Sequence, residues 1–148
     1  MKNSLLVLEG IRKSFGARHI LDITRFELAA GESYVLTGEN GSGKTTLLRV
    51  LAGLDDAEVG ACRYEGRPFD LHTYPKWLRH DVIYVHQHPY LFRSSIVDNI
   101  SYGLKARGMA ASACEPLVRD AIAWAGVGDL LDVPPHSLSG GEKQRVAL

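Results

Sequence analysis

One glycine-rich string in the first third of the chain contains residue types that could bind phosphate. Its eight residues are Gly38, Glu39, Asn40, Gly41, Ser42, Gly43, Lys44 and Thr45. They match the spacing G-x-x-x-x-G-K-[ST], in which glycines let the backbone curl until successive N–H groups point at one polyanion. In such a loop, Lys44 reaches the β- and γ-phosphates of a nucleotide and the Thr45 hydroxyl is the expected Mg²⁺ ligand. We predict that these residues, together with Thr46, bind a nucleoside triphosphate.

The sequence on either side of this loop predicts the two elements that must position it. Residues 34–37 form a short apolar run, which indicates a buried strand that leads into the loop. Residues 45–54 carry leucine and valine at helical spacing, and Gly53 lies near the end of that helix. A glycine-rich turn with an incidental lysine is the alternative interpretation, and the order of strand, loop and helix argues against it.

A second glycine-containing string, Leu-Ser-Gly-Gly-Glu, occupies residues 138–142. Ser139 fits a helix N-cap, and Glu142 three residues later completes a capping box. Gly140 and Gly141 carry no side chains, so a phosphate could approach the amides of this helix start closely. A capped helix without a ligand is the alternative, and from this string alone it is the better explanation. The phosphate loop upstream reverses that preference.

The remaining pattern predicts a mixture of strands and helices. Residues 5–8 and 20–28 indicate an antiparallel pair, and residues 62–64 and 82–85 indicate further strands. Residues 95–126 are helical in pattern. The last helix of this stretch is expected to start with a capping box of Ser112 and Glu115 and to have Pro116 in its first turn. One face of this helix is expected to be buried. That face consists of Leu117, Val118, Ala121, Ile122 and Ala125.

The charge balance, the apolar runs and the cysteines of the chain limit which kinds of partner it could bind. Lys and Arg total 17, as do Asp and Glu, so the formal net charge is zero. Nucleic-acid binding usually needs a basic excess, and we therefore expect no nucleic-acid partner. No apolar run approaches the roughly 18 residues of a membrane-spanning helix. Cys62 and Cys114 lack the spacing of a metal site and are expected to be reduced thiols.

Taken together and in this order, the two glycine-containing strings resemble the phosphate loop and the signature motif of the ATP-binding cassette (ABC) ATPases. The whole chain resembles the first two thirds or so of the nucleotide-binding domain of ABC transporters. This resemblance implies an α/β P-loop NTPase fold with an N-terminal antiparallel β part, a parallel core sheet and a helical subdomain, incomplete at the C-terminus. It implies a β and phosphate-loop part over residues 1–94, a helical subdomain over 95–137 and the start of the signature helix over 138–148.

The resemblance also assigns roles to residues outside the phosphate loop. Phe15 lies where the family has an aromatic residue that stacks on adenine, although Phe15 taken alone fits a core residue equally well. Ile20 matches an aliphatic residue beside that ring. Gln87 matches the glutamine that contacts Mg²⁺ and the attacking water. Ser139, Gly140 and Gly141 would contact the γ-phosphate of ATP bound to a second ATP-binding subunit, so that ATP joins two subunits.

By the same resemblance, the protein is an ATPase whose ATP binding and hydrolysis drive solute transport. Its partners would be transmembrane permease subunits, received in a groove formed by Leu91, Phe92 and residues 96–100, and indirectly a solute-binding protein. It would then lie at the cytoplasmic face of the inner or plasma membrane. Residues 84–108 look most like importers of oxyanions such as tungstate or molybdate. A soluble ABC ATPase that acts on ribosomes, or an unrelated P-loop NTPase, is the alternative.

The chain departs from the family after the signature motif. The family continues into a strand that ends in Asp-Glu, which orders Mg²⁺ and polarises the attacking water, and has a histidine later. None of these follows before Leu148. We therefore expect residues 1–148 on their own to fold poorly, because a sheet without its central strands exposes apolar faces. For the same reason we expect negligible hydrolysis by this segment alone.

Overall fold

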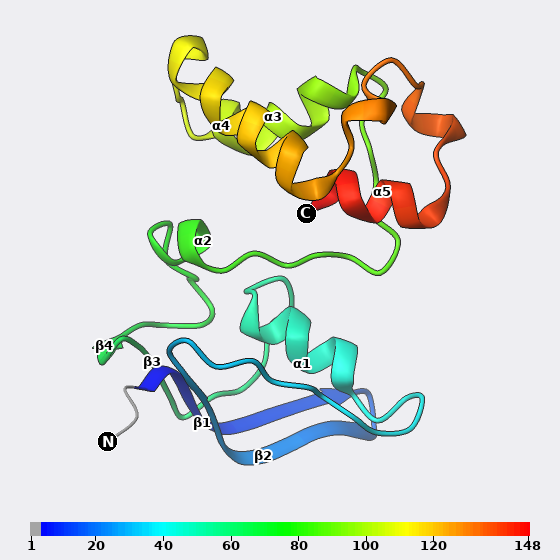
Figure 1. Ribbon diagram of the computed structural model, residues 1–148. Coiled ribbons are helices and arrows are strands. Elements are labelled where there is room, and N and C mark those ends of the chain that lie inside the picture. The colour runs from blue at the N-terminus through cyan, green and yellow to red at the C-terminus, as the bar shows by residue number, and fades with distance from the viewer. Residues whose placement is uncertain (1–3) are drawn as a thin grey trace. The chain divides into compact units, whose positions relative to one another are not determined.

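A computed structural model describes residues 4–148 (Figure 1). The chain divides into two compact units, Met1–Tyr84 and Val85–Leu148. The first contains all of the described strands and the phosphate loop, and the second contains three helices of eight or more residues. Across residues 4–148, none of the helices combines the length and apolarity needed to span a bilayer.

The first unit is built on a long β-hairpin. Strands β1 (Ser4–Phe15) and β2 (Arg18–Ala29) pair antiparallel, which confirms the predicted pair and extends both of its strands. Short strands β3 (Ala61–Tyr64) and β4 (Arg67–Pro68) complete a sheet with the order β2-β1-β3-β4. The hairpin turn places Phe15 directly opposite Arg18 in the ladder. One end of the hairpin therefore holds the residue predicted to stack on adenine.

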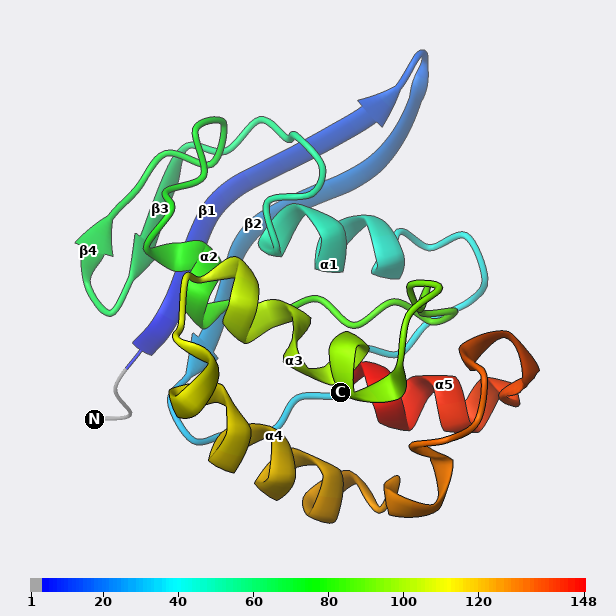
Figure 2. The same ribbon diagram turned by 90° about the horizontal axis from the view of Figure 1, so that it is seen from above.

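Helix α1 (Lys44–Leu51) packs on this sheet (Figures 1 and 2). Its buried face consists of Leu47, Val50 and Leu51, which join the same apolar cluster as Leu8 and Ile11 of β1. Burial of such side chains contributes about 1.5–3 kcal/mol each relative to exposure. The packing fixes the axis of α1, and therefore the direction in which its N-terminus points.

Two predicted strands are absent from the described residues. Residues 34–37 and 82–85 form neither ladders nor bridges with another segment of residues 4–148, and no parallel pair is present there. Val35 is 87% exposed and Ile83 is 73% exposed. The apolar pattern of these segments is that of buried parallel strands, but a ladder needs a neighbouring strand on at least one side. The strand assignments for these two segments are therefore wrong in this structure.

The second unit is helical, with α3 (Ile96–Ala106) and α4 (Ala111–Ala125) side by side (Figure 1). Two short 3₁₀ turns, η1 (Gly128–Leu130) and η2 (Pro135–Ser137), lead to α5 (Gly140–Ala147). A single four-residue helix, α2 (Leu78–Asp81), belongs to the first unit. The core of the second unit consists of Ile96, Val127, Leu138 and Val146.

Helix α4 starts earlier than predicted and buries only part of the predicted face, namely Val118, Ile122 and Ala125. Its N-cap is Ala110, whose side chain makes no capping bond, so the predicted capping box of Ser112 and Glu115 is wrong. Backbone bonds from residues 113 and 114 to the carbonyl of Ala110 start the helix there, which places Pro116 inside the helix rather than in its first turn.

The buried positions of α4 are Cys114 and Val118, and the partly buried Ile122 packs against the core of the second unit. These residues are four apart and share one face of the helix. Leu117 and Ala121, which we predicted to be buried, are exposed. Cys62 and Cys114 are both free and buried, and burial raises the pKa of the Cys62 thiol to about 11.

Candidate functional site

The phosphate loop reaches α1 through a glycine that no other residue could replace without strain. Gly43 is the N-cap of α1 and has φ 90°, a left-handed conformation that side chains disfavour. A methyl carbon at this position would lie 3.0 Å from the carbonyl oxygen of Ile20 and 3.0 Å from a methyl carbon of Leu21. The loop is therefore seated against β2 at Ile20. Ile20, predicted to lie beside adenine, supports the base of the loop in this structure.

Lys44 is held over its own loop. Its ammonium Nζ donates to the backbone carbonyls of Gly38 at 2.8 Å and Glu39 at 2.7 Å, with the Ser42 hydroxyl at 3.4 Å. These acceptors lie at the N-terminal end of the loop, so the ammonium lies beside the curled backbone. A phosphate that entered the loop would meet this charge without a large movement of the side chain.

The start of α1 leaves backbone donors for a ligand. No side chain caps this N-terminus, so none of its first N–H groups is used by a neighbouring side chain. Thr45 in the first turn is exposed, and Thr46 is half-buried beside it. An ammonium, uncapped amides and a threonine hydroxyl form a donor set that fits a magnesium-bound polyphosphate.

Phe15 is available to a ligand rather than part of the core. Its side chain is 57% exposed at the end of the β1–β2 hairpin. The ammonium of Lys13 lies 5.2 Å from the centre of its ring, on one face. An exposed ring that already interacts with a cation has the electron-rich face that suits stacking on a purine.

The capping box predicted at the start of α5 is confirmed. The Ser139 hydroxyl accepts from the backbone N–H of Glu142 at 3.4 Å, and the Glu142 carboxylate accepts from the Ser139 N–H at 2.7 Å. The hydroxyl of Ser139 also donates to this carboxylate at 2.7 Å. These bonds to Ser139 lower the pKa of Glu142. Gly140 and Gly141 have no atoms of other residues within 4 Å of a would-be side chain, so this face is open.

Replacing Ser139 with alanine should destabilise the second unit, because an N-cap serine contributes about 1 kcal/mol to helix stability. We expect Ser139→Gly to cost only a few tenths of a kcal/mol, since glycine tolerates the N-cap backbone. Ser137→Ala is the matched control: its hydroxyl donates to the Pro134 carbonyl at 2.8 Å but caps no helix. Urea unfolding measures all three, and equal losses for Ser139→Ala and Ser137→Ala would contradict a specific capping role.

Gln87 and the signature helix are joined by a hydrogen bond across 57 positions of sequence. Gln144 of α5 donates from Nε2 to the backbone carbonyl of Gln87 at 3.0 Å. Gln87 itself is exposed, so its side chain remains available to solvent or a ligand. The structure thus brings together Gln87 and the helix that follows the Leu-Ser-Gly-Gly-Glu string. Nothing in the sequence near Gln144 signals this contact, because it depends on how the second unit folds.

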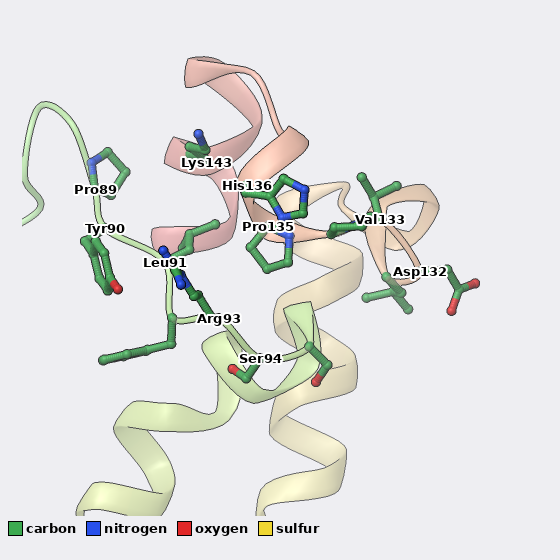
Figure 3. A pocket seen from close by; sticks show the side chains of 14 residues that line it. Pro89, Tyr90, Leu91, Arg93, Ser94, Asp132, Val133, Pro135, His136 and Lys143 are labelled. Carbon is green, nitrogen blue, oxygen red and sulfur yellow. The ribbon is translucent and has the colours of Figure 1, made fainter.

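A groove of about 850 Å³ lies beside the residues expected to receive a partner (Figure 3). Segment 89–95 forms one side, the loop of residues 131–136 forms the other, and Lys143 of α5 contributes as well. Within this lining, the ring of Phe92 lies 5.8 Å from that of Tyr90, and 4.6 Å from that of Tyr102, which is not a lining residue. All three rings are substantially exposed. Exposed aromatic rings beside an apolar groove are typical of protein interaction sites.

Comparisons with known proteins agree with this geometry. Residues 21–148 match the model of the ABC transporter family. The molybdate/tungstate import ATP-binding protein WtpC of Thermococcus kodakarensis is 37% identical over 145 residues, covering 97% of this chain and 43% of that protein. The spermidine/putrescine import ATP-binding protein PotA of Marinobacter nauticus is 35% identical over 149 residues, covering 100% of this chain and 39% of that protein.

A solved structure has the same fold. The structure of cbiO1 from Clostridium perfringens, part of the ABC transporter complex cbiONQ, superposes with a TM-score of 0.82 at 27% identity. The match covers 99% of this chain and 60% of that one. It confirms the predicted α/β fold class. This chain spans less than two thirds of the length of each of these three proteins.

Proposed function

This chain belongs to the ABC transporter family, and we propose that it is the ATP-binding part of an importer that couples ATP binding and hydrolysis to solute transport. One observation carries the proposal. The ammonium of Lys44 lies against the carbonyls of Gly38 and Glu39, directly before an uncapped helix start. Positive charge and unpaired amides at one point are what a nucleotide polyphosphate requires.

Each residue of the site then has a separate task. Lys44 and the loop amides bind the β- and γ-phosphates, and Phe15 stacks on the base. Thr45 and Gln87 would hold Mg²⁺, which when bound neutralises charge that develops on the transferred phosphate. Gln87 also orients the water that attacks the γ-phosphate. Ile20 packs against Gly43, the residue at which the loop joins α1, and so supports the loop.

The open face at Gly140 and Gly141 supports a role for a second subunit. With Ser139, these residues would contact the γ-phosphate of ATP bound to a second ATP-binding subunit, so that ATP closes the dimer. The hydroxyl proton of Ser139 points to Glu142 in this structure. Binding of a phosphate would require this proton to turn from Glu142 to a phosphate oxygen.

The groove beside Leu91 and Phe92 supports a permease partner. Its apolar lining and adjacent aromatic rings suit a short helix of a transmembrane subunit. The protein would therefore lie at the cytoplasmic face of the membrane, bound to the permease. A solute-binding protein would contact the permease and act on this chain only indirectly.

We propose an inorganic oxyanion, such as tungstate, as the solute. A relative named for molybdate and tungstate import supports this choice. Because a relative of similar identity is named for spermidine and putrescine import, the test must include a polyamine. Solute choice depends on the permease and binding protein, so it must be measured in intact cells.

The experiment is an uptake assay in a strain that lacks the gene. We expect uptake of tungstate or molybdate to fall to background and to be restored by the wild-type gene but not by a Lys44→Ala gene. Loss of spermidine uptake instead would overturn the oxyanion proposal alone. Normal uptake of every solute, together with cosedimentation of the protein with ribosomes, would overturn the transport proposal.

A further inference from the structure

Arg18 lies beside the phosphate loop, although no sequence motif singles it out. It is the first residue of β2 and pairs with Phe15 across the hairpin. A methyl carbon on Gly41 would lie 3.8 Å from Nη2 of Arg18, so the guanidinium reaches the middle of the loop. Arg18 therefore pairs with Phe15 through the backbone and approaches the phosphate loop through its side chain.

Arg18 differs from Arg12, Lys13 and Arg25 of the same hairpin in having no partner among residues 4–148. Arg12 pairs with Asp22, Lys13 donates to the carbonyl of Asp56, and Arg25 pairs with Glu9. For Arg18, residues 4–148 provide neither an acidic side chain nor a hydrogen-bond acceptor within bonding distance. Its guanidinium is exposed and its five N–H donors are open to a ligand.

We propose that Arg18 is a nucleotide-binding residue that contacts the α-phosphate, the phosphate nearest the base. This proposal rests on the proposed function, because it needs a nucleotide in the loop. The base end of the site is marked by Phe15, and the β/γ end by Lys44. Arg18 stands between them, opposite Phe15 and against Gly41. A planar guanidinium binds two phosphate oxygens at once, which a lysine ammonium cannot do.

Contact with the α-phosphate has a specific consequence. ATP and ADP carry the same α-phosphate, so Arg18 should strengthen the binding of both by the same factor. A contact with the γ-phosphate would favour ATP alone. The ratio of the ATP and ADP affinities therefore separates a contact with the phosphates that both nucleotides share from a contact with the γ-phosphate.

The experiment is calorimetric titration of the full-length protein with ADP and with a non-hydrolysable ATP analogue at low salt. We expect Arg18→Met, which keeps the length of the side chain, to weaken both ligands about tenfold. Arg18→Lys should recover part of that loss. Arg12→Met is the matched control, because Arg12 lies on the same hairpin with its own partner, and should change neither affinity more than about twofold.

Three results would overturn the proposal. These are unchanged affinities in Arg18→Met, a loss for the ATP analogue but not for ADP, and equal losses in Arg18→Met and Arg12→Met. Failure of the proposed function gives a different result: the wild-type protein would bind neither nucleotide more tightly than a Lys44→Ala variant. Thermal unfolding of every variant within a few degrees of the wild type verifies that the fold is kept.

Discussion

Lys44→Ala is expected to reduce ATP turnover by the full-length protein about 10²–10³-fold, the usual loss when one preorganised donor to a developing charge is removed. Affinity for ATP should fall about ten- to a hundredfold, because a charge-assisted contact with phosphate is lost. Stability should hardly change. The carbonyls of Gly38 and Glu39 that accept from Lys44 lie in an exposed loop, where water can replace the ammonium.

The distinguishing feature of Lys44→Ala is therefore a loss of function at constant stability. The free energy of unfolding should stay within about 0.5 kcal/mol of the wild type, as for other exposed positions. Lys76→Ala, at an exposed lysine of the same unit, is the control for removal of a positive charge. Turnover of Lys44→Ala within threefold of the control, or a large drop in its unfolding free energy, would contradict the assigned role of the ammonium.

Three features encoded within a few consecutive residues were predicted correctly from the sequence, whereas the equally local capping box of Ser112 and Glu115 was not. The capping box of Ser139 and Glu142 depends on a spacing of three residues, and the structure contains each of its bonds. Helix α1 follows from apolar residues one helical turn apart, and the antiparallel hairpin from two β-rich runs joined by a tight turn. In each case the signal and its physical cause lie in the same short stretch.

Features that depend on a distant partner were not predictable in the same way. Residues 34–37 have the apolar pattern of a buried strand, but a ladder needs a partner that local pattern does not identify. Of the face predicted for α4, Leu117 and Ala121 are exposed, because the neighbouring elements of the fold decide how much of an apolar helix surface is covered. The approach of Arg18 to Gly41 and the bond from Gln144 to Gln87 both join segments that only the fold brings together.

The C-terminus of α1 shows how a distant contact stabilises the site. Gly53 ends the helix with φ 66°, and Gly53 and Leu54 donate backbone bonds to the carbonyls of Val50 and Arg49 at 3.0 and 2.9 Å. This is a Schellman-type ending, which favours glycine. The hydroxyl of Tyr74, buried against this turn, donates to the carbonyl of Leu51 at 3.0 Å. Burial raises the pKa of Tyr74 to about 12.

Gly53→Ala is expected to have the largest effect on stability of any single methyl group added to the first unit. The new carbon would lie 2.2 Å from Cδ2 of Tyr74, closer than side chains approach one another, so the buried ring must move. Overpacking of this kind costs about 1–3 kcal/mol, and the left-handed backbone adds about 1–2 kcal/mol for a residue other than glycine. We expect a total loss of about 2–5 kcal/mol in urea unfolding.

Gly66→Ala separates the two causes of this loss. Gly66 has φ 76°, but no atom lies within 4 Å of a would-be side chain there, so only the backbone cost of about 1–2 kcal/mol applies. The difference between the two variants in unfolding free energy measures the cost of displacing Tyr74. Equal losses of unfolding free energy would show that the ring accommodates the methyl group. Because the helix that Gly53 ends begins at Lys44, Gly53→Ala should also weaken ATP binding, whereas Gly66→Ala should not.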